Sequence, residues 1–155
     1  MHTKNKFEWC LKKAKEGGKG IKEIKPDLKE AKYHIDKALY NLKKMESDIE
    51  KGYPDWAVSS AFYAMYHALL ALLYKLGYES ENQECSINAI EYLILTKKID
   101  LDIKYIKMID PNVEESIIKL RERFQYGSET KVGSEILDTV RKNAKEFVEK
   151  FQELI

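Results

Sequence analysis

The amino-acid sequence predicts an all-α protein, built as an antiparallel up-and-down bundle of four or five helices. Apolar residues recur every three or four positions through most of the chain, which is the period of a helix with one buried face. Only three prolines and seven glycines interrupt the 155 residues. The segments between the helical stretches are short, which favours antiparallel neighbours and a bundle.

The amino-acid composition narrows the class of protein further. A chain of 155 residues favours one domain with a real core. It is 44% hydrophobic and 34% charged, and 27 basic residues face 26 acidic ones, so a generally basic nucleic-acid-binding surface is not supported. The N-terminal residues lack an apolar signal core, so we expect a cytoplasmic protein. Cys10 and Cys85 match no metal or redox spacing, and two free thiols are expected.

Residues 1–25 are predicted to be an N-terminal extension, and residues 26–155 the helical bundle. Within the extension, residues 5–16 have the pattern of a short helix, with Phe7, Trp9 and Leu11 as apolar contacts. The glycines of "GGKG" end it at residues 17–20. We expect this extension to be mobile or loosely attached.

The first main helix is predicted over residues 27–51. Asp27 can cap it, and Glu30 completes a capping box three residues later. Gly52 closes it. One apolar face is predicted from Leu28, Ala31, Ile35, Ala38, Leu42, Met45 and Ile49.

The second helix, predicted over residues 54–76, is apolar nearly all round. No charged residue occurs from Ala57 to Tyr74, and Gly77 ends the helix. Polar side chains recur at helical spacing and the rest of the chain is highly charged, so we expect the middle of the bundle rather than a membrane span. Its three stripes are alanine-rich (57, 61, 64, 68, 71), bulky and apolar (58, 62, 65, 69, 72, 76), and semi-polar (Ser60, Tyr63, His67, Tyr74).

Three more helices are predicted towards the C-terminus. The third spans residues 86–98, residues 99–110 form a short helix or loop, and the fourth spans about 112–126 and ends at Gly127. Ser134 can cap the fifth helix, whose apolar residues form a narrow packing seam.

The sequence gives no pattern for a metal, a cofactor or a common hydrolytic triad. A di-iron bundle needs Glu-x-x-His pairs, because that spacing puts both ligands on one inward face. None of the histidines at positions 2, 34 and 67 has a glutamate three residues before it. No Ser-His-Asp, Cys-His or Walker pattern is present either, so no metal and no cofactor are expected.

The stretch "GYPDWAVSSAFYAMYHALLALLYKLGY" resembles the second helix of HEPN-domain proteins, which are small helical bundles. The resemblance rests on the Tyr-Ala-Met-Tyr-His string that ends at His67. Downstream, "LRERFQYG" is similar to the family's arginine-containing fourth helix, with Arg121 and Tyr126 at the matching positions. The last helix is similar too, so the resemblance covers residues 27–155 and implies a HEPN-like bundle that forms a homodimer.

The resemblance implies two kinds of activity, and the arginine motif separates them. Many HEPN domains are metal-independent ribonucleases in which an arginine is followed four to six residues later by a histidine, in a cleft between two protomers. Here Tyr126 stands where that histidine would be, and Arg123 has no histidine behind it. A tyrosine titrates near pH ~10 and is a poor base at neutral pH. We therefore expect a non-hydrolytic member of the family.

The expected ligand-binding residues are Arg121, Tyr63, His67 and Tyr126, and the first three of these are expected to face one cleft. Arg121, Tyr126 and His67 are also the weak candidates for catalysis. The alternatives stay open: His67 as a hydrogen-bonded core residue, Arg121 as a solvated or ion-paired charge, and Tyr126 as a packing residue. No role is assigned to His34.

Three functions follow as hypotheses. The first is a binding or interaction module that takes a nucleotide, RNA or a protein, and the resemblance implies a small nucleotidyltransferase as partner in a toxin–antitoxin-like pair. The second is a ribonuclease with an altered Arg-x4-Tyr site, using Arg121 with Tyr126 or His67. The third is a purely structural helical bundle.

Overall fold

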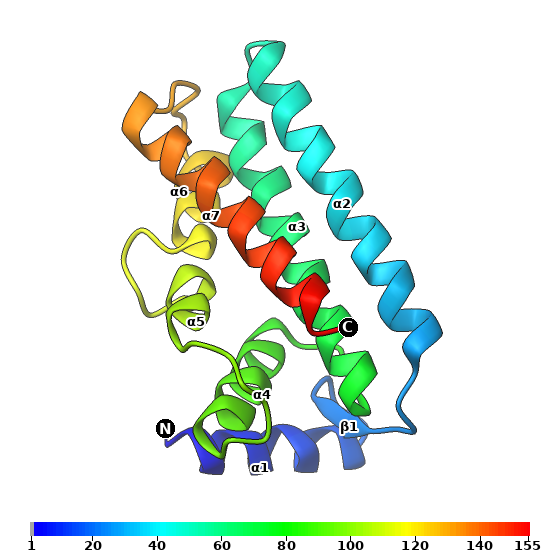
Figure 1. Ribbon diagram of the computed structural model, residues 1–155. Coiled ribbons are helices and arrows are strands. Elements are labelled where there is room, and N and C mark those ends of the chain that lie inside the picture. The colour runs from blue at the N-terminus through cyan, green and yellow to red at the C-terminus, as the bar shows by residue number, and fades with distance from the viewer. Residues whose placement is uncertain (1) are drawn as a thin grey trace.

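The structure, a computed structural model, describes residues 2–155 and is predominantly helical (Figure 1). Its elements in chain order are α1 (Thr3–Lys15), β1 (Ile21–Glu23), α2 (Leu28–Glu50), α3 (Pro54–Leu76), β2 (Tyr78–Ser80), α4 (Gln83–Leu95), α5 (Lys104–Ile109), α6 (Ile117–Tyr126) and α7 (Ser134–Glu153). The five main predicted helices correspond to α2, α3, α4, α6 and α7. The predicted extension helix is α1, and the ambiguous segment contains α5.

A long antiparallel hairpin of α2 and α3 forms the frame of the molecule (Figure 1). The turn between them contains Gly52, whose φ of +84° lies in the left-handed region that glycine tolerates best. In Figure 1, α7 runs diagonally across the hairpin, and α6 lies beside α3. Because α2, α4, α6 and α7 all contact it, α3 is the central helix of the fold.

The burial of α3 follows from its uncharged sequence. All five residues of the predicted alanine stripe are fully buried, as small side chains at a close helix contact should be. By length and hydropathy α3 could cross a membrane, but 78% of its most apolar window is buried inside the protein. The prediction that this helix lies in the middle of the fold is therefore confirmed.

The start of α2 is capped by only one half of the predicted capping box. The Asp27 side chain accepts a hydrogen bond from the Glu30 backbone N–H at 3.0 Å. The reciprocal bond from Glu30 does not form, because the Asp27 N–H donates to the Tyr74 carbonyl at 2.9 Å. The predicted apolar face is otherwise correct except at Leu28, which is exposed in the first turn.

A two-stranded antiparallel ribbon, β1 with β2, was not predicted. Ile21 pairs with Ser80 and Glu23 with Tyr78. Gly77 turns the chain from α3 into β2 with φ +92°, and a Cβ there would lie 2.9 Å from the Ile24 carbonyl oxygen. The ribbon ties together the two ends of the α2–α3 hairpin.

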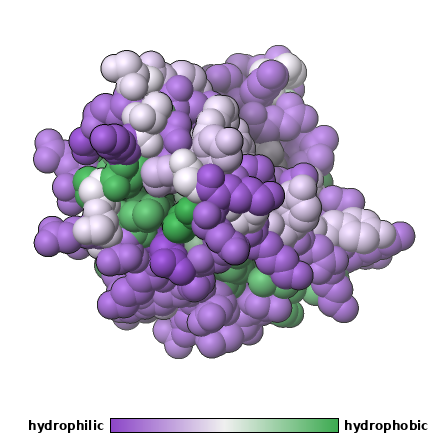
Figure 2. Space-filling view, turned by 90° about the horizontal axis from the view of Figure 1, so that it is seen from above, coloured by the Kyte–Doolittle hydropathy of each residue, from purple (hydrophilic) through white to green (hydrophobic). Residues whose placement is uncertain are grey.

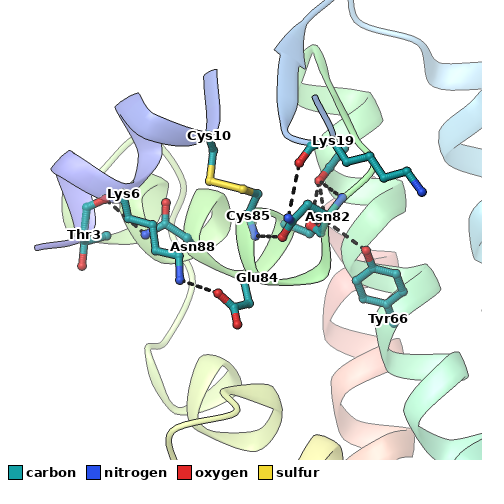
Figure 3. Close-up of a disulfide and its surroundings, with 11 residues drawn as sticks. Thr3, Lys6, Cys10, Lys19, Tyr66, Asn82, Glu84, Cys85 and Asn88 are labelled. Carbon is teal, nitrogen blue, oxygen red and sulfur yellow. Dashed lines mark hydrogen bonds and ion pairs between the residues drawn. A yellow bond between two sulfur atoms is a disulfide. The ribbon is translucent and has the colours of Figure 1, made fainter. Parts of the chain in front are cut away.

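The first helix forms where predicted, but it is not loosely attached. Phe7 and Cys10 are buried, and α1 packs on α4. The expectation of two free thiols is wrong, because Cys10 and Cys85 form a disulfide with their Cα atoms 5.8 Å apart (Figure 3). These residues are 75 positions apart in sequence, so only the folded chain brings them together.

Some helix ends differ from the prediction because other residues supply the caps. Asn82 caps α4, which starts at Gln83 rather than at residue 86. Ser116 caps α6, which starts at Ile117 rather than near residue 112. Ser134 is the first residue of α7 and not its cap, since Gly133 occupies the N-cap position.

Candidate functional site

Arg121 and Tyr63 meet on the surface between α6 and α3. Nη1 of Arg121 donates to the Tyr63 hydroxyl at 3.4 Å and to Oε1 of Gln125 at 3.4 Å. The guanidinium carbon lies 4.4 Å from the centre of the Phe62 ring and 5.7 Å from that of Tyr63. Packing on two aromatic rings holds the charged group in one orientation.

The positive charge of Arg121 is not neutralised by a carboxylate. On the same helix, Lys119 lies 3.8 Å from Glu122 and Arg123 lies 3.0 Å from Glu129. No acidic side chain lies within ion-pair distance of Arg121 in residues 2–155, and its buried Nε has no hydrogen-bond partner there. A fixed guanidinium with donors to spare is suited to a phosphate or carboxylate group.

The surroundings of Arg121 extend along α3. Ser59 donates from its hydroxyl to Oε1 of Gln125 at 3.2 Å. Ser59 and Gln125 line a small crevice of about 30 Å³ together with Asp55, Trp56 and Phe124. Sequence reasoning missed Gln125 and Phe62. Gln125 follows Arg121 by four residues, a spacing that brings two side chains together on a helix.

His67 does not join this group but pairs with His34 on α2. Their Nδ1 atoms are 2.9 Å apart and their ring centres 5.2 Å apart, with 18° between the ring planes. The ring centres are farther apart than the Nδ1 atoms by about two ring radii, so both nitrogens point along the line that joins the centres. The rings therefore meet edge to edge in an N–H···N hydrogen bond. Nε2 of His34 lies 3.8 Å from Glu30, which favours a proton on that nitrogen. Nδ1 of His67 is then the donor and Nδ1 of His34 the acceptor.

Both histidines are weak bases in this setting. The pKa of His67 falls to about 4, chiefly because burial disfavours the charged ring, and also because Lys37 and, once it is protonated, His34 would repel a second positive charge. Burial also lowers the pKa of His34, although the Glu30 carboxylate opposes this. At neutral pH the pair is therefore uncharged, and His67 is a poor candidate for a general base.

Tyr126 lies outside the group as well. Its side chain is 71% exposed at the end of α6, with no hydrogen bond within residues 2–155. The structure thus brings together two of the four predicted ligand-binding residues, Arg121 and Tyr63. It places His67 one helical turn along α3 from Tyr63, facing α2.

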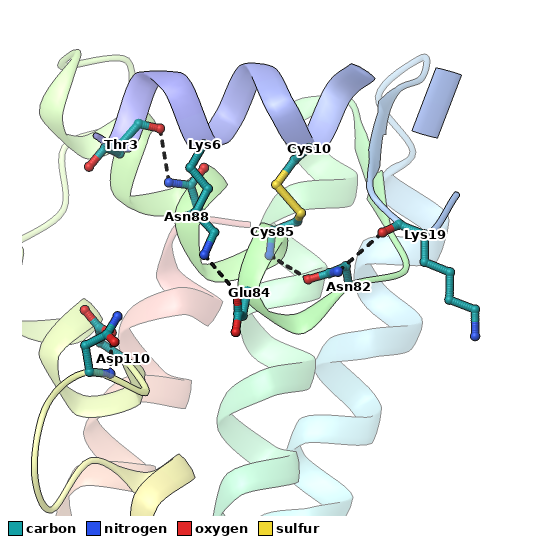
Figure 4. Close-up of polar contacts among 10 residues, drawn as sticks. Thr3, Lys6, Cys10, Lys19, Asn82, Glu84, Cys85, Asn88 and Asp110 are labelled. Carbon is teal, nitrogen blue, oxygen red and sulfur yellow. Dashed lines mark hydrogen bonds and ion pairs between the residues drawn. A yellow bond between two sulfur atoms is a disulfide. The ribbon is translucent and has the colours of Figure 1, made fainter. Parts of the chain in front are cut away.

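A larger hollow of about 450 Å³ lies between α1, α4 and α6 and shares no residue with the predicted set. Figure 4 shows Lys6 reaching Glu84 on one side of it and Asp110 on the other. Its basic groups are already matched, since Lys6 lies 2.9 Å from Glu84 and Lys119 lies 3.8 Å from Glu122. Viewed from above, the molecular surface is mostly polar, with apolar residues in a few separate patches (Figure 2). Arg121 is therefore the stronger candidate for anion recognition.

Comparison with known proteins agrees with this predominantly helical architecture. The family model of the HEPN domain matches residues 31–154, well over half of the chain. The chain belongs to the HEPN-domain family. No curated protein matches it.

Proposed function

We propose that this HEPN domain is a non-hydrolytic binding module in which Arg121 and Tyr63 recognise an anionic group of a nucleotide or RNA. The observation that carries the proposal is the guanidinium of Arg121, held over Phe62 with no carboxylate partner in the described chain. The two histidines on α2 and α3 are bonded to each other, so neither supplies an acid or base next to that arginine.

Binding is tested with the purified protein and labelled oligoribonucleotides or ATP, by fluorescence anisotropy or calorimetry. Arg121→Gln should weaken binding about tenfold or more, since a charge-assisted hydrogen bond contributes on the order of 1.5–3 kcal/mol. Arg123→Gln is the matched control, because Arg123 is already paired with Glu129. Equal losses in both variants would contradict a specific role for Arg121.

A ribonuclease with an Arg-x4-Tyr site is the second hypothesis from the sequence. It needs Tyr126 or His67 to act on the same phosphodiester as Arg121. The exposure of Tyr126 and the bond between His67 and His34 favour the non-hydrolytic proposal. Incubation with a broad RNA panel without metal should leave the RNA intact. Cleavage that is abolished by Arg121→Gln would establish the ribonuclease instead.

The proposed binding module acts as a homodimer. Trp56, Tyr63 and Leu70 follow one another at seven-residue steps along one side of α3. Trp56 and Tyr63 are 55% and 39% exposed, and Leu70 is half-buried, so this apolar strip of a core helix is left partly uncovered. Sedimentation should give twice the chain mass of 18.2 kDa, and Trp56→Ser should lower it. A monomeric mass at micromolar concentration would contradict the dimer.

The proposed protein partner is a small nucleotidyltransferase in a toxin–antitoxin-like pair, and its support is the family membership. Co-expression with the products of the neighbouring genes, followed by size-exclusion chromatography, tests this. The absence of a complex would count against the pairing. If variants of Arg121 and Tyr63 changed stability but no binding, the purely structural bundle would replace the proposal.

A cytoplasmic location belongs to the same proposal, supported by the burial of α3 inside the fold. The disulfide argues against a cytoplasmic location, because such bonds are rare in reducing compartments outside hyperthermophiles. Rapid alkylation of cells before lysis, followed by mass spectrometry of the Cys10 and Cys85 peptides, shows the state of the bond in its own compartment.

A further inference from the structure

The outer face of α2 carries alternating lysine and tyrosine side chains. Five residues follow one another at steps of four, four, three and four, so they lie along one side of the helix. All five are exposed. In Figure 1, α2 forms one edge of the molecule, and its contacts with α3 and α7 leave this side open. We call this surface the lysine–tyrosine face: Lys29, Tyr33, Lys37, Tyr40 and Lys44.

The lysine–tyrosine face is locally basic in a chain of nearly balanced charge. Lys43 is exposed beside it, and the acidic residues between positions 29 and 44 are Asp36, which is exposed, and Glu30, which is partly exposed. Of these lysines, Lys44 has a carboxylate partner, Asp48 at 2.9 Å, and the others have none within the described residues. The face from Lys29 to Lys44 covers about 22 Å of helix, at about 1.5 Å per residue.

The two tyrosines leave more than half of their surface open to solvent. Tyr33 is 54% exposed and Tyr40 is 62% exposed, and neither hydroxyl makes a hydrogen bond within residues 2–155. Each ring has one ammonium group beside it: Lys29 lies 6.0 Å from the centre of Tyr33, and Lys37 lies 5.5 Å from that of Tyr40. An exposed aromatic ring next to a free cation is thus repeated two helical turns apart.

We propose that the lysine–tyrosine face binds single-stranded nucleic acid. The lysines would neutralise phosphates, and unpaired bases would stack on the tyrosine rings, a combination typical of proteins that bind single strands. The charges alone would also fit an acidic peptide or a duplex. The tyrosines favour a single strand, because an acidic peptide has no bases and a duplex keeps its bases stacked inside. This surface is separate from the Arg121 site.

The proposal is tested by titrating the protein into fluorescein-labelled oligouridine at low salt and following anisotropy. Replacing both rings in a Tyr33→Ala, Tyr40→Ala variant should weaken binding about tenfold or more, since stacking contributes ~1–3 kcal/mol per base. A Lys29→Gln, Lys37→Gln variant should weaken binding and also reduce the slope of log K against log salt. The reduction should be about 1.4, at ~0.7 for each phosphate that is no longer neutralised.

A Trp9→Ala, Lys13→Gln variant is the control. It removes a pair of an exposed ring and a half-buried lysine on α1, where Lys13 lies 4.7 Å from the Trp9 ring centre, and should bind as the parent protein does. Circular dichroism checks that each variant is folded. The competitors are a duplex of the same length and polyglutamate, and both should compete poorly.

Four results would overturn the proposal. The first is no binding of oligouridine at low salt, and the second is an equal weakening in the control variant. The third is polyglutamate or duplex competing as well as the single strand while the tyrosine variant is unaffected. The fourth is a tyrosine variant that sediments as a lighter species, which would assign this face to the dimer. Loss of binding in Arg121→Gln alone would instead place the ligand at the Arg121 site.

Discussion

At the scale of single residues, side chains of the semi-polar stripe of α3 form hydrogen bonds with the neighbouring helices. Ser60 donates to Asp48 of α2 at 2.8 Å, Tyr63 accepts from Arg121 of α6, and His67 bonds to His34 of α2. The stripe was visible in the sequence as a polar row on an apolar helix. Which neighbour each side chain meets depends on how the helices are positioned against one another, which periodicity does not encode.

The paired histidines make stability depend on pH. Both have a pKa in the folded protein below the value of about 6.5 found in unfolded chains. As the pH falls, the unfolded state therefore binds more protons at these rings than the folded state does. The folded state loses stability from about pH 6.5 down to about pH 4, the pKa of His67. Above that range neither state is charged at these rings, and their contribution is constant.

This dependence is measured as the urea midpoint across the same pH range, for the parent and for a His34→Gln, His67→Gln variant. Carboxylates titrate in both proteins, so the difference between the two curves isolates the histidines. The parent should lose more stability than the variant as the pH falls. Parallel curves would mean that the histidine pair does not carry the effect.

At the scale of elements, the sequence predicted every main helix and missed the ribbon. A long helix can be predicted because its apolar residues repeat with the helical period over many positions. For α3 both ends were predicted correctly. The strands β1 and β2 are three residues each, too short for a pattern, and pair across a gap that contains the whole α2–α3 hairpin. The capping box at Asp27 was only half right, because the Asp27 N–H donates to the carbonyl of Tyr74, which lies far away in sequence.

The junction at Gly77 gives a test of the ribbon. Gly77→Ala should destabilise the protein by more than about 1 kcal/mol, because the backbone is left-handed there and the new methyl group would press on the Ile24 carbonyl. Gly133→Ala is the control, since its φ is −55° and no atom lies within 4 Å of the new Cβ. Chemical denaturation of both variants measures the difference. A Gly77 variant as stable as the Gly133 variant would show that the junction is not constrained.

At the scale of the whole molecule, the disulfide is the feature that changes the predicted organisation most. It fixes α1 to α4, so the first helix is an integral part of the structure (Figure 3). The family model begins at residue 31, beyond both α1 and the ribbon's first strand. The disulfide thus links α1, which lies outside the matched residues, to α4, which lies within them.

Removing the disulfide should lower the free energy of unfolding by about 2–5 kcal/mol, because a cross-link between distant positions restricts the unfolded chain. A Cys10→Ala, Cys85→Ala variant measures this by thermal or urea unfolding. Treating the parent with a reductant should lower its stability towards that of the variant. A variant that is as stable as the oxidised parent would show that the bond contributes nothing.

The bond between Cys10 and Cys85 also makes a closed covalent circuit that runs through β1, both long helices and their tip at Gly52. A protease that cuts once at this exposed tip would leave two pieces that still travel as one band on a non-reducing gel. Adding a reductant would release them as separate bands. The exposed turn that looks most vulnerable to cleavage is thus the place where a single cut does not divide the protein.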